Sequence, residues 1–298
     1  MKTVRICAHA KLNLRLAVGP KRRDGYHEIA TLLTAISLHD TLTFAPRARG
    51  FALAVDGPEA RGVPRAGANL VLQAARALQA ELGVTRGATI RLTKRVPHGA
   101  GLGGGSSDAA ATLRGLLGLW GRRLPRARLL AFAARLGSDV PFFLVRSPAF
   151  AHGRGEILEE LPPFRPPLQL VVVVPPVRVA TAWAYRQYTI PKSRLTRRRR
   201  LATLVPLRTE VVARSKVKHN FFNDLENAVL PRVPPVREAL AALRAGGAIE
   251  ARMTGSGSAV FGLVVAPRAR ERVAVQLRMQ GYKVYVARSI RAGSRPCR

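Results

Sequence analysis

A run of glycines between a predicted strand and a predicted helix is the feature of this sequence that most constrains its fold. Residues 94–108 read Lys-Arg-Val-Pro-His-Gly-Ala-Gly-Leu-Gly-Gly-Gly-Ser-Ser-Asp. The alternating residues 88–96 predict a strand, and Pro97 ends it because proline has no N–H to donate to a sheet. The Ala- and Leu-rich segment after the loop predicts a helix, with Ser106 or Ser107 as its N-cap.

This loop predicts an anion-binding site. Glycine allows positive φ, and without Cβ atoms several N–H groups can converge on one bound oxygen. The helix behind the loop adds the positive end of its dipole, so a phosphate chain is the expected ligand. A flexible Gly/Ser turn is the alternative, but a turn does not need so many glycines. The loop is not a Walker A motif, because no Lys-Ser or Lys-Thr closes it, and it lacks the last glycine of the dinucleotide fingerprint.

The order of the predicted elements favours an α+β chain with two domains. The proline-rich residues 161–167 indicate a boundary, which gives domains 1–162 and 163–298. After the boundary, the order of strands and helices suits a ferredoxin-like split β-α-β layer. Within these domains, residues 41–44 predict a short separate strand and residues 223–230 predict a helix.

Charge is the unusual property of the composition. The chain carries 50 Lys and Arg against 17 Asp and Glu, a net charge of +33. Such a balance is typical of nucleic-acid-binding proteins. However, the arginines are scattered, and no helix-turn-helix, zinc finger or aromatic RNA-binding signature is visible. We therefore expect no specific nucleic-acid partner.

The apolar segments and the cysteines of the chain indicate its expected cellular compartment. No apolar run is long enough to span a bilayer, and the first residues lack the apolar region of a signal peptide. The two cysteines, Cys7 and Cys297, lie at opposite ends, so neither a zinc site nor a disulfide framework is expected. Together these features predict a reduced, cytoplasmic protein with no membrane partner.

Several polar residues have both an ordinary and a functional interpretation. Asp139 stands between a predicted helix end and an apolar Pro-Phe-Phe run, where an unpaired carboxylate is costly. Its ordinary interpretation is an N-cap for the next segment. Its functional interpretation is a general base or the partner of a positive charge. Lys11 and Asn13 could be the wet face of an edge strand. Tyr26 and His27 could be ordinary residues after an Asp-Gly turn.

Four separated parts of the chain resemble the motifs of the GHMP kinases, the superfamily of galactokinase, homoserine, mevalonate and phosphomevalonate kinases. These parts are Ala10-Lys11-Leu12-Asn13-Leu14 with Arg23-Asp24-Gly25-Tyr26-His27, the loop 97–107, Leu136-Gly137-Ser138-Asp139-Val140-Pro141-Phe142-Phe143, and Thr254-Gly255-Ser256-Gly257-Ser258. The triple glycine and the Asp-Gly-Tyr-His element resemble one branch in particular. Kinases of that branch phosphorylate the 2-hydroxyl of a cytidine-diphosphate-linked methylerythritol in the non-mevalonate isoprenoid pathway.

The resemblance implies a fold and a set of roles. The fold would have an N-terminal ribosomal-protein-S5-like domain and a C-terminal ferredoxin-like domain. Asp139 would be the catalytic carboxylate, with Lys11 beside it to stabilise a developing alkoxide. The ATP side would consist of Pro97, Gly99, Gly101, Leu102, Gly103, Gly104, Gly105, Ser106, Ser107 and Asn69. The substrate side would consist of Asn13, Tyr26, His27, Lys94, Thr181, Thr254 and Gly255.

The resemblance also implies ATP with Mg²⁺. No carboxylate cluster marks a metal cage, so we expect phosphates and water to hold the ion. A monomer or weak homodimer is expected. Asn69 could instead be only a helix N-cap, and residues 190–220 are unusually basic and predict a surface insertion. Three alternatives stay open at this point: another GHMP small-molecule kinase, a nucleic-acid-binding protein with a kinase fold, and a ribosome-associated protein.

Overall fold

The computed structural model describes residues 3–189, 221–291 and 294–297. The basic segment 190–220, predicted to be a surface insertion, lies outside the described residues. Within the described ranges, no helix is both long and apolar enough to cross a bilayer.

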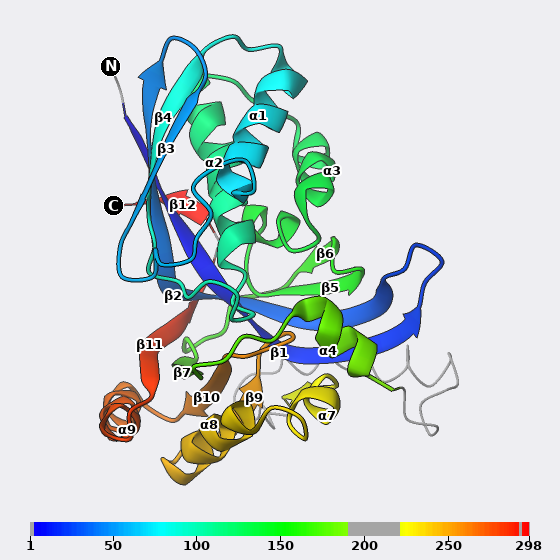
Figure 1. The fold of residues 1–298 in the computed structure, drawn as a ribbon, viewed down its shortest axis with the longest axis vertical. Helices are drawn as coiled ribbons and strands as arrows, with labels where there is room; N and C mark the ends of the chain where they lie inside the picture. Colours follow the sequence, from blue (N-terminus) through cyan, green and yellow to red (C-terminus); the bar gives the residue numbers. More distant parts are fainter. Residues whose placement is uncertain (1–2, 190–220, 292–293, 298) are drawn as a thin grey trace.

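A long antiparallel hairpin runs through the molecule. Its strands are β1 (Val4–Lys21) and β2 (His27–Arg47), joined by the turn that contains the Asp-Gly pair (Figure 1). The prediction of a separate strand at 41–44 is wrong, because these residues are the end of β2. The pairing shifts register after His9, Asn13 and Val18, and such irregularities bend a hairpin without breaking it.

Helices cover one face of the N-terminal part of the sheet. β4 (Gly87–Thr93) pairs antiparallel with β2 and parallel with β3 (Phe51–Asp56). The covering helices are α1 (Leu70–Leu82), α2 (Gly104–Trp120) and α3 (Arg126–Leu136) (Figure 1). A mid-helix glycine lets α2 approach the sheet, since a Cβ at Gly115 would lie 2.2 Å from the ring of Phe44.

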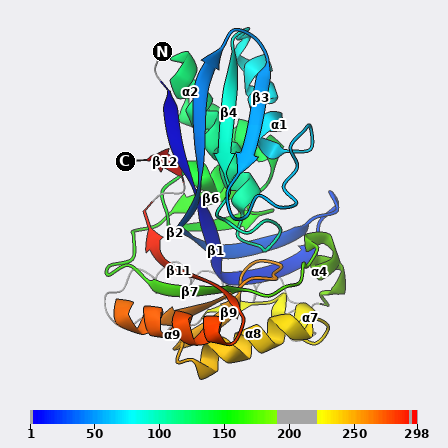
Figure 2. The ribbon, with the colours of Figure 1, turned by 60° about the vertical axis from the view of Figure 1, so that its left-hand side comes forward.

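A second layer forms the C-terminal part. Its antiparallel strands lie in the order β11 (Lys283–Ile290), β7 (Gln169–Val174), β10 (Val260–Val264) and β9 (Glu250–Met253). α8 (Pro234–Ala245) and α9 (Pro267–Met279) lie together below these strands (Figure 2). Apolar residues of α8, α9 and this layer share one core cluster. The α+β class predicted from the sequence is confirmed.

Short elements complete the chain. They are η1 (Pro141–Leu144), β5 (Ala149–Gly153), β6 (Ile157–Glu160), α4 (Thr181–Gln187), β8 (Phe222–Asn223), α7 (Glu226–Val229) and β12 (Ser294–Pro296). The helix predicted over 223–230 is therefore too long. Asn223 is in a strand, and its Oδ1 accepts from the N–H of Leu225, which separates β8 from α7.

The two parts share the long hairpin. β8 pairs with β1, β11 pairs with β2, and β12 returns to pair with β1. The sheet therefore runs across the boundary proposed at residues 162 and 163, and that division of the chain stays a prediction.

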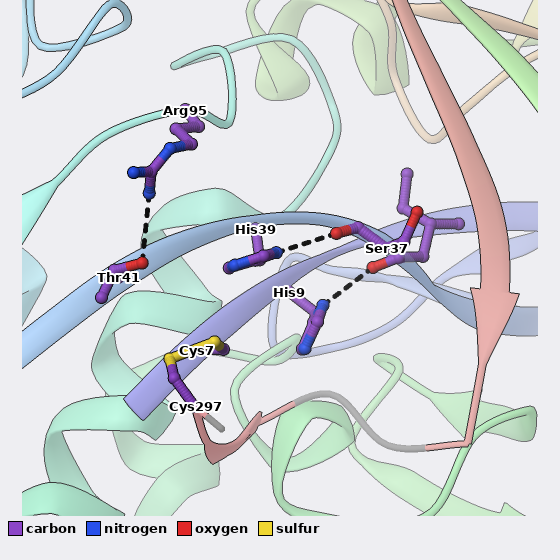
Figure 3. Close-up of a disulfide and its surroundings, with 8 residues drawn as sticks. Cys7, His9, Ser37, His39, Thr41, Arg95 and Cys297 are labelled. Atoms are coloured by element: carbon purple, nitrogen blue, oxygen red, sulfur yellow. Dashed lines mark hydrogen bonds between the residues drawn. A yellow bond between two sulfur atoms is a disulfide. The ribbon is translucent and has the colours of Figure 1, made fainter. Parts of the chain in front are cut away.

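A disulfide joins Cys7 and Cys297 (Figure 3), so the expectation of a reduced protein without a disulfide is wrong. β12 lies against β1 with Cys7 opposite Arg295, and the Cys297 N–H donates to the carbonyl of Arg5 at 3.2 Å. This pairing brings the two Cα atoms to 5.3 Å, within the usual range for a disulfide. The positions of the two cysteines in the sequence do not predict this disulfide, because it depends on the pairing of β12 with β1.

Loss of the disulfide is expected to lower stability. Cys7→Ser should reduce the free energy of unfolding by about 2–5 kcal/mol, because the bond closes nearly the whole chain in the unfolded state. Thermal melting of the wild type with and without reductant measures this. The Cys7→Ser/Cys297→Ser variant is the control and should not respond to reductant. An identical melting temperature for the oxidised and reduced wild type would contradict the expectation.

Candidate active site

The glycine loop connects β4 to α2 and lies against the middle of β1, at Lys11. Gly99, Gly101 and Gly103 all have positive φ, at +73°, +81° and +70°. A Cβ at Gly101 would lie 2.6 Å from the carbonyl oxygen of Thr254. A Cβ at Gly103 would lie 2.9 Å from Lys11 Cγ and 2.9 Å from the Phe143 ring. Gly101 and Gly103 therefore require glycine for both conformation and space.

The start of α2 differs from the prediction. The helix begins at Gly104 with Gly103 as N-cap, so the prediction of Ser106 or Ser107 as N-cap is wrong. The left-handed conformation of Gly103 lets the helix start before the serines. Among the described residues, no side chain caps the first N–H groups of α2. This helix end retains the features of an anion-binding site.

Lys11 and Asp139 come together although they are far apart in sequence. Lys11 Nζ lies 3.7 Å from Asp139 Oδ2. The lysine side chain is buried and the carboxylate is 42% exposed, so the pair faces open space through Asp139. The Lys11 N–H also donates to the carbonyl of Leu102 at 2.9 Å, which attaches β1 to the glycine loop.

A buried polar network continues from Lys11 into the second glycine loop, residues 254–258. Lys11 Nζ donates to Asn13 Oδ1 at 2.6 Å. The Asn13 N–H donates to Thr254 Oγ1 at 3.0 Å, and Asn13 Nδ2 donates to Thr31 Oγ1 at 2.8 Å. A Cβ at Gly255 would lie 3.4 Å from Lys11 Nζ, so the loop backbone lies directly beside the ammonium group.

Asn223 belongs to this network and was missed from the sequence. Its buried Nδ2 donates to the carbonyls of Met253, at 2.8 Å, and Gly255, at 2.7 Å. The neighbouring Asp224 accepts from the N–H of Val18 at 3.0 Å. The signal available in the sequence was an Asn-Asp pair among apolar residues, but the helix predicted over 223–230 included this pair as ordinary helical residues.

Lys11, Asn13, Asp139 and parts of both glycine loops line one cavity of about 920 Å³. Most residues predicted for the site line it: Lys11, Asn13, Tyr26, His27, Pro97, Gly99, Gly101, Leu102, Gly103, Gly104, Gly105, Ser106, Asp139, Thr181 and Gly255. Arg154, Tyr185 and Ser256 also line it and were not predicted. Thr181 Oγ1 and Ser256 Oγ lie 3.0 Å apart, which connects α4 to the second glycine loop.

One end of the cavity is aromatic. Tyr26 is 55% exposed, and the guanidinium carbon of Arg154 lies 5.1 Å from the centre of its ring. The rings of His27 and Tyr185 have centres 5.5 Å apart, and His27 Nδ1 donates to the carbonyl of Gly19 at 2.9 Å. Desolvation, and then the nearby charge of Asp139, raise the pKa of Tyr185, so its hydroxyl stays protonated. Flat, partly exposed rings of this kind suit a nucleobase.

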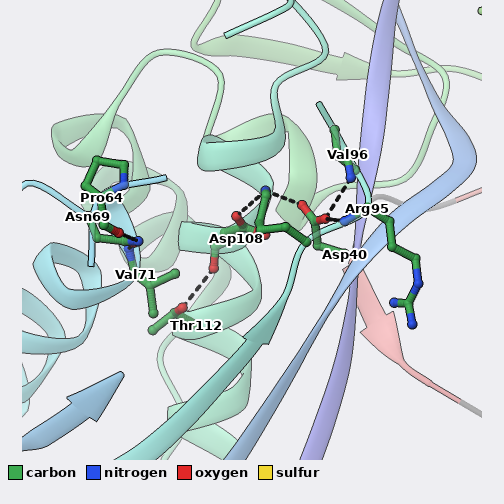
Figure 4. Close-up of polar contacts among 9 residues, drawn as sticks. Asp40, Pro64, Asn69, Val71, Arg95, Val96, Asp108 and Thr112 are labelled. Atoms are coloured by element: carbon green, nitrogen blue, oxygen red, sulfur yellow. Dashed lines mark hydrogen bonds and ion pairs between the residues drawn. The ribbon is translucent and has the colours of Figure 1, made fainter. Parts of the chain in front are cut away.

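Four predicted residues do not line the cavity. Asn69 is the N-cap of α1: its Oδ1 accepts from the N–H of Val71 at 2.9 Å, and its Nδ2 donates to the carbonyl of Pro64 (Figure 4). Lys94 is buried beneath the glycine loop among carboxylates. Thr254 is buried as a partner of Asn13, and Ser107 is buried with no hydrogen-bond partner for its Oγ among the described residues.

The donor set fits a magnesium nucleotide rather than a resident metal. Among residues 3–189, 221–291 and 294–297, no group of three or more His, Cys, Asp or Glu side chains could hold an ion. The cavity offers convergent backbone N–H groups, hydroxyls and one carboxylate, Asp139. Mg²⁺ in such a site is held largely by phosphate oxygens and water.

Comparisons with known proteins agree along the chain. The GHMP kinases N terminal domain matches residues 69–147, and the GHMP kinases C terminal domain matches residues 214–283. The 4-diphosphocytidyl-2-C-methyl-D-erythritol kinase of Pelotomaculum thermopropionicum is 42% identical over 283 residues, which are 95% of this chain and 96% of that protein. The kinase of the same name from Gloeobacter violaceus is 38% identical over 98% of this chain and 96% of its own length.

The chain belongs to the 4-diphosphocytidyl-2-C-methyl-D-erythritol kinases, a branch of the GHMP kinases. A solved 4-(cytidine 5'-diphospho)-2C-methyl-D-erythritol kinase superposes with a TM-score of 0.76 at 36% identity, covering 96% of this chain and 98% of that one. Homoserine kinase from Cytophaga hutchinsonii has a TM-score of 0.74 at 20% identity, over 100% and 98% of the two chains, and shows the fold alone. The two-domain GHMP kinase fold predicted from the sequence is confirmed.

Gly103→Ala tests the geometry that this kinase requires at its loop. The new Cβ would meet Lys11 and Phe143, so we expect the KM for ATP to rise by about tenfold or more. Gly121→Ala is the matched control, because Gly121 ends the same helix at φ +65° with no heavy atom near the added Cβ. Both variants should lose about 1–2 kcal/mol of stability from the left-handed conformation. Equal activity of the two variants would contradict the account.

Asn223→Asp tests the missed asparagine. An aspartate cannot donate to the carbonyls of Met253 and Gly255, so the second glycine loop should shift beside Lys11. We expect kcat to fall by about 10- to 100-fold. Asn227→Asp, the same change at an exposed position on α7, is the control and should leave kcat unchanged. Unchanged kcat in a folded Asn223→Asp variant would show that the carbonyl contacts do not matter.

Proposed function

We propose that this chain transfers the γ-phosphoryl group of ATP to the 2-hydroxyl of 4-diphosphocytidyl-2-C-methyl-D-erythritol, a step of non-mevalonate isoprenoid precursor synthesis. The observation that carries the proposal is one cavity with three chemical parts. An anion-binding glycine loop lies on one side, the Lys11–Asp139 pair lies in the middle, and an aromatic end is formed by Tyr26, His27 and Tyr185.

The reaction requires little covalent chemistry from the protein. The substrate hydroxyl oxygen attacks the γ-phosphorus in line, the bond from that phosphorus to the β–γ bridging oxygen breaks, and ADP leaves. The hydroxyl proton passes to Asp139, whose exposed oxygens face the cavity. The Lys11 ammonium, held by Asn13, stabilises the negative charge that develops on the oxygens.

The remaining parts of the site position the two substrates. The N–H groups of residues 99–106 bind the ATP phosphates, and Mg²⁺ accompanying the nucleotide would supply further neutralisation of their charge. Tyr26 stacks on the cytosine, and His27 reads its edge, with Tyr185 packing beside the imidazole. The Asn69 side chain is buried and bonds to Pro64 and Val71, so its contribution is to fix the start of α1.

Family membership bears on the alternatives that the sequence left open. Relatives that align over most of the chain carry the name of this kinase at 38–42% identity, whereas the homoserine kinase is 20% identical. The nucleic-acid and ribosomal alternatives rest on charge alone, and no contact described above supports them. A cytoplasmic monomer or weak homodimer remains part of the proposal.

The test is ATP consumption with 4-diphosphocytidyl-2-C-methyl-D-erythritol for the wild type and Asp139→Ala. The wild type should turn over with Mg²⁺ and ATP, and the variant should lose about two to four orders of magnitude in kcat while still folding. Asp56→Ala, which removes a carboxylate on the surface of β3, is the control and should remain active. A wild type that is inert with this alcohol would overturn the proposal.

A further inference from the structure

A buried ion cluster lies beneath the glycine loop and takes no part in the chemistry described above. It consists of Lys94, Asp40 and Asp108, whose side chains are at most 5% exposed. Lys94 Nζ donates to Asp40 Oδ2 and, at 2.8 Å, to Asp108 Oδ2. Figure 4 shows Asp40 and Asp108 on opposite sides of one ammonium group, each reached by a dashed line.

The cluster joins three separate elements at both ends of the loop. Asp40 comes from β2, Lys94 begins the loop, and Asp108 lies in the first turns of α2. Asp40 Oδ1 also accepts from the N–H groups of Arg95, at 2.5 Å, and Val96, at 2.8 Å (Figure 4). A Cβ at Gly104 would lie 3.3 Å from Lys94 Nζ, so the ammonium is in contact with the first residue of α2.

A loop this rich in glycine needs such an anchor. Glycine loses more backbone entropy on ordering than any other residue, and a phosphate nest works only when its N–H groups are already aimed. Asp40 fixes the entry of the loop, and the Lys94–Asp108 contact fixes its exit relative to that entry. Because both contacts are buried, breaking either one would leave an unpaired charge out of water, which is costly. The contacts therefore hold the loop in one position.

The charges of the cluster suit a position below an anion site. Burial raises the pKa of Asp108 well above its usual range, against the attraction of Lys94. Burial alone would lower the pKa of Lys94, but Asp108 and Asp40 raise it. The two aspartates therefore keep the Lys94 ammonium charged beneath the loop.

We propose that Lys94 and Asp108 are positioning residues for the ATP phosphates, and that they act by fixing the glycine loop without touching either substrate. This inference rests on the proposed function, because it assumes that the loop binds ATP. It replaces the assignment of Lys94 to the substrate side. It predicts an effect on nucleotide affinity and on the KM for ATP, with little effect on the KM for the alcohol.

The decisive pair of variants is Asp108→Ala and Asp108→Asn. Alanine removes the ion pair between Lys94 and Asp108 and leaves the Lys94–Asp40 pair intact, whereas asparagine keeps an oxygen that can accept from Lys94 Nζ. We expect the Kd of a non-hydrolysable ATP analogue, measured by calorimetry without the alcohol, to rise about 10- to 100-fold for Asp108→Ala. Asp108→Asn should stay within about threefold of the wild type, because the conservative variant restores the contact.

Two further readouts separate positioning from general damage. Amide hydrogen exchange should speed up over residues 94–108 in Asp108→Ala and remain unchanged in α3. The KM for the alcohol should stay within about twofold, since Asp108 is buried and does not line the cavity. If Asp108→Ala does not fold, Asp108→Ser, with a hydroxyl too short to reach Lys94, replaces it in the same assays.

The outcomes distinguish this inference from the proposed function. A folded Asp108→Ala variant that binds the analogue as tightly as the wild type overturns the inference, whatever the enzyme phosphorylates. A wild type that binds the analogue but does not phosphorylate the alcohol overturns the proposed function and leaves the inference standing if the variants behave as expected. A wild type that does not bind the analogue overturns both.

Discussion

The close approach of two glycine loops to each other and to β1 is the contact on which the rest of this active site depends. The N–H of Ala259 donates to the carbonyl of Ala100 at 3.0 Å, and the N–H of Lys11 donates to the carbonyl of Leu102 at 2.9 Å. At Gly101 and Gly103 there is no room for a Cβ. The first glycine loop, Lys11 and the C-terminal part therefore hold one fixed arrangement.

Two buried polar networks hold this contact from opposite sides. On one side, Asn223 holds the backbone of Gly255 next to Asn13 and Lys11. On the other, the Lys94 cluster holds the first phosphate loop. Between them, Asp139 is the open member of the site, which suits a group that must meet a substrate hydroxyl.

The sequence predicted local features well and tertiary contacts poorly. The glycine loop and the helix behind it followed from composition, because these signals are contained within a short window. The Lys11–Asp139 pair came from a family resemblance, since no spacing rule joins residues this far apart. The Cys7–Cys297 disulfide, the burial of Lys94 and the role of Asn223 were missed, because each depends on which distant strand lies alongside. The left-handed Gly103 moved the start of α2 for a different reason, which is a backbone conformation that serine rarely adopts.

The most direct test of the central claim is a crystal structure of the protein with a non-hydrolysable ATP analogue and 4-diphosphocytidyl-2-C-methyl-D-erythritol. The account predicts that the phosphates lie on the N–H groups of residues 99–106. It also predicts the 2-hydroxyl within about 3 Å of Asp139, next to Lys11, and in line with the γ-phosphorus. A nucleotide bound away from the glycine loop, or a hydroxyl turned away from the Lys11–Asp139 pair, would contradict it.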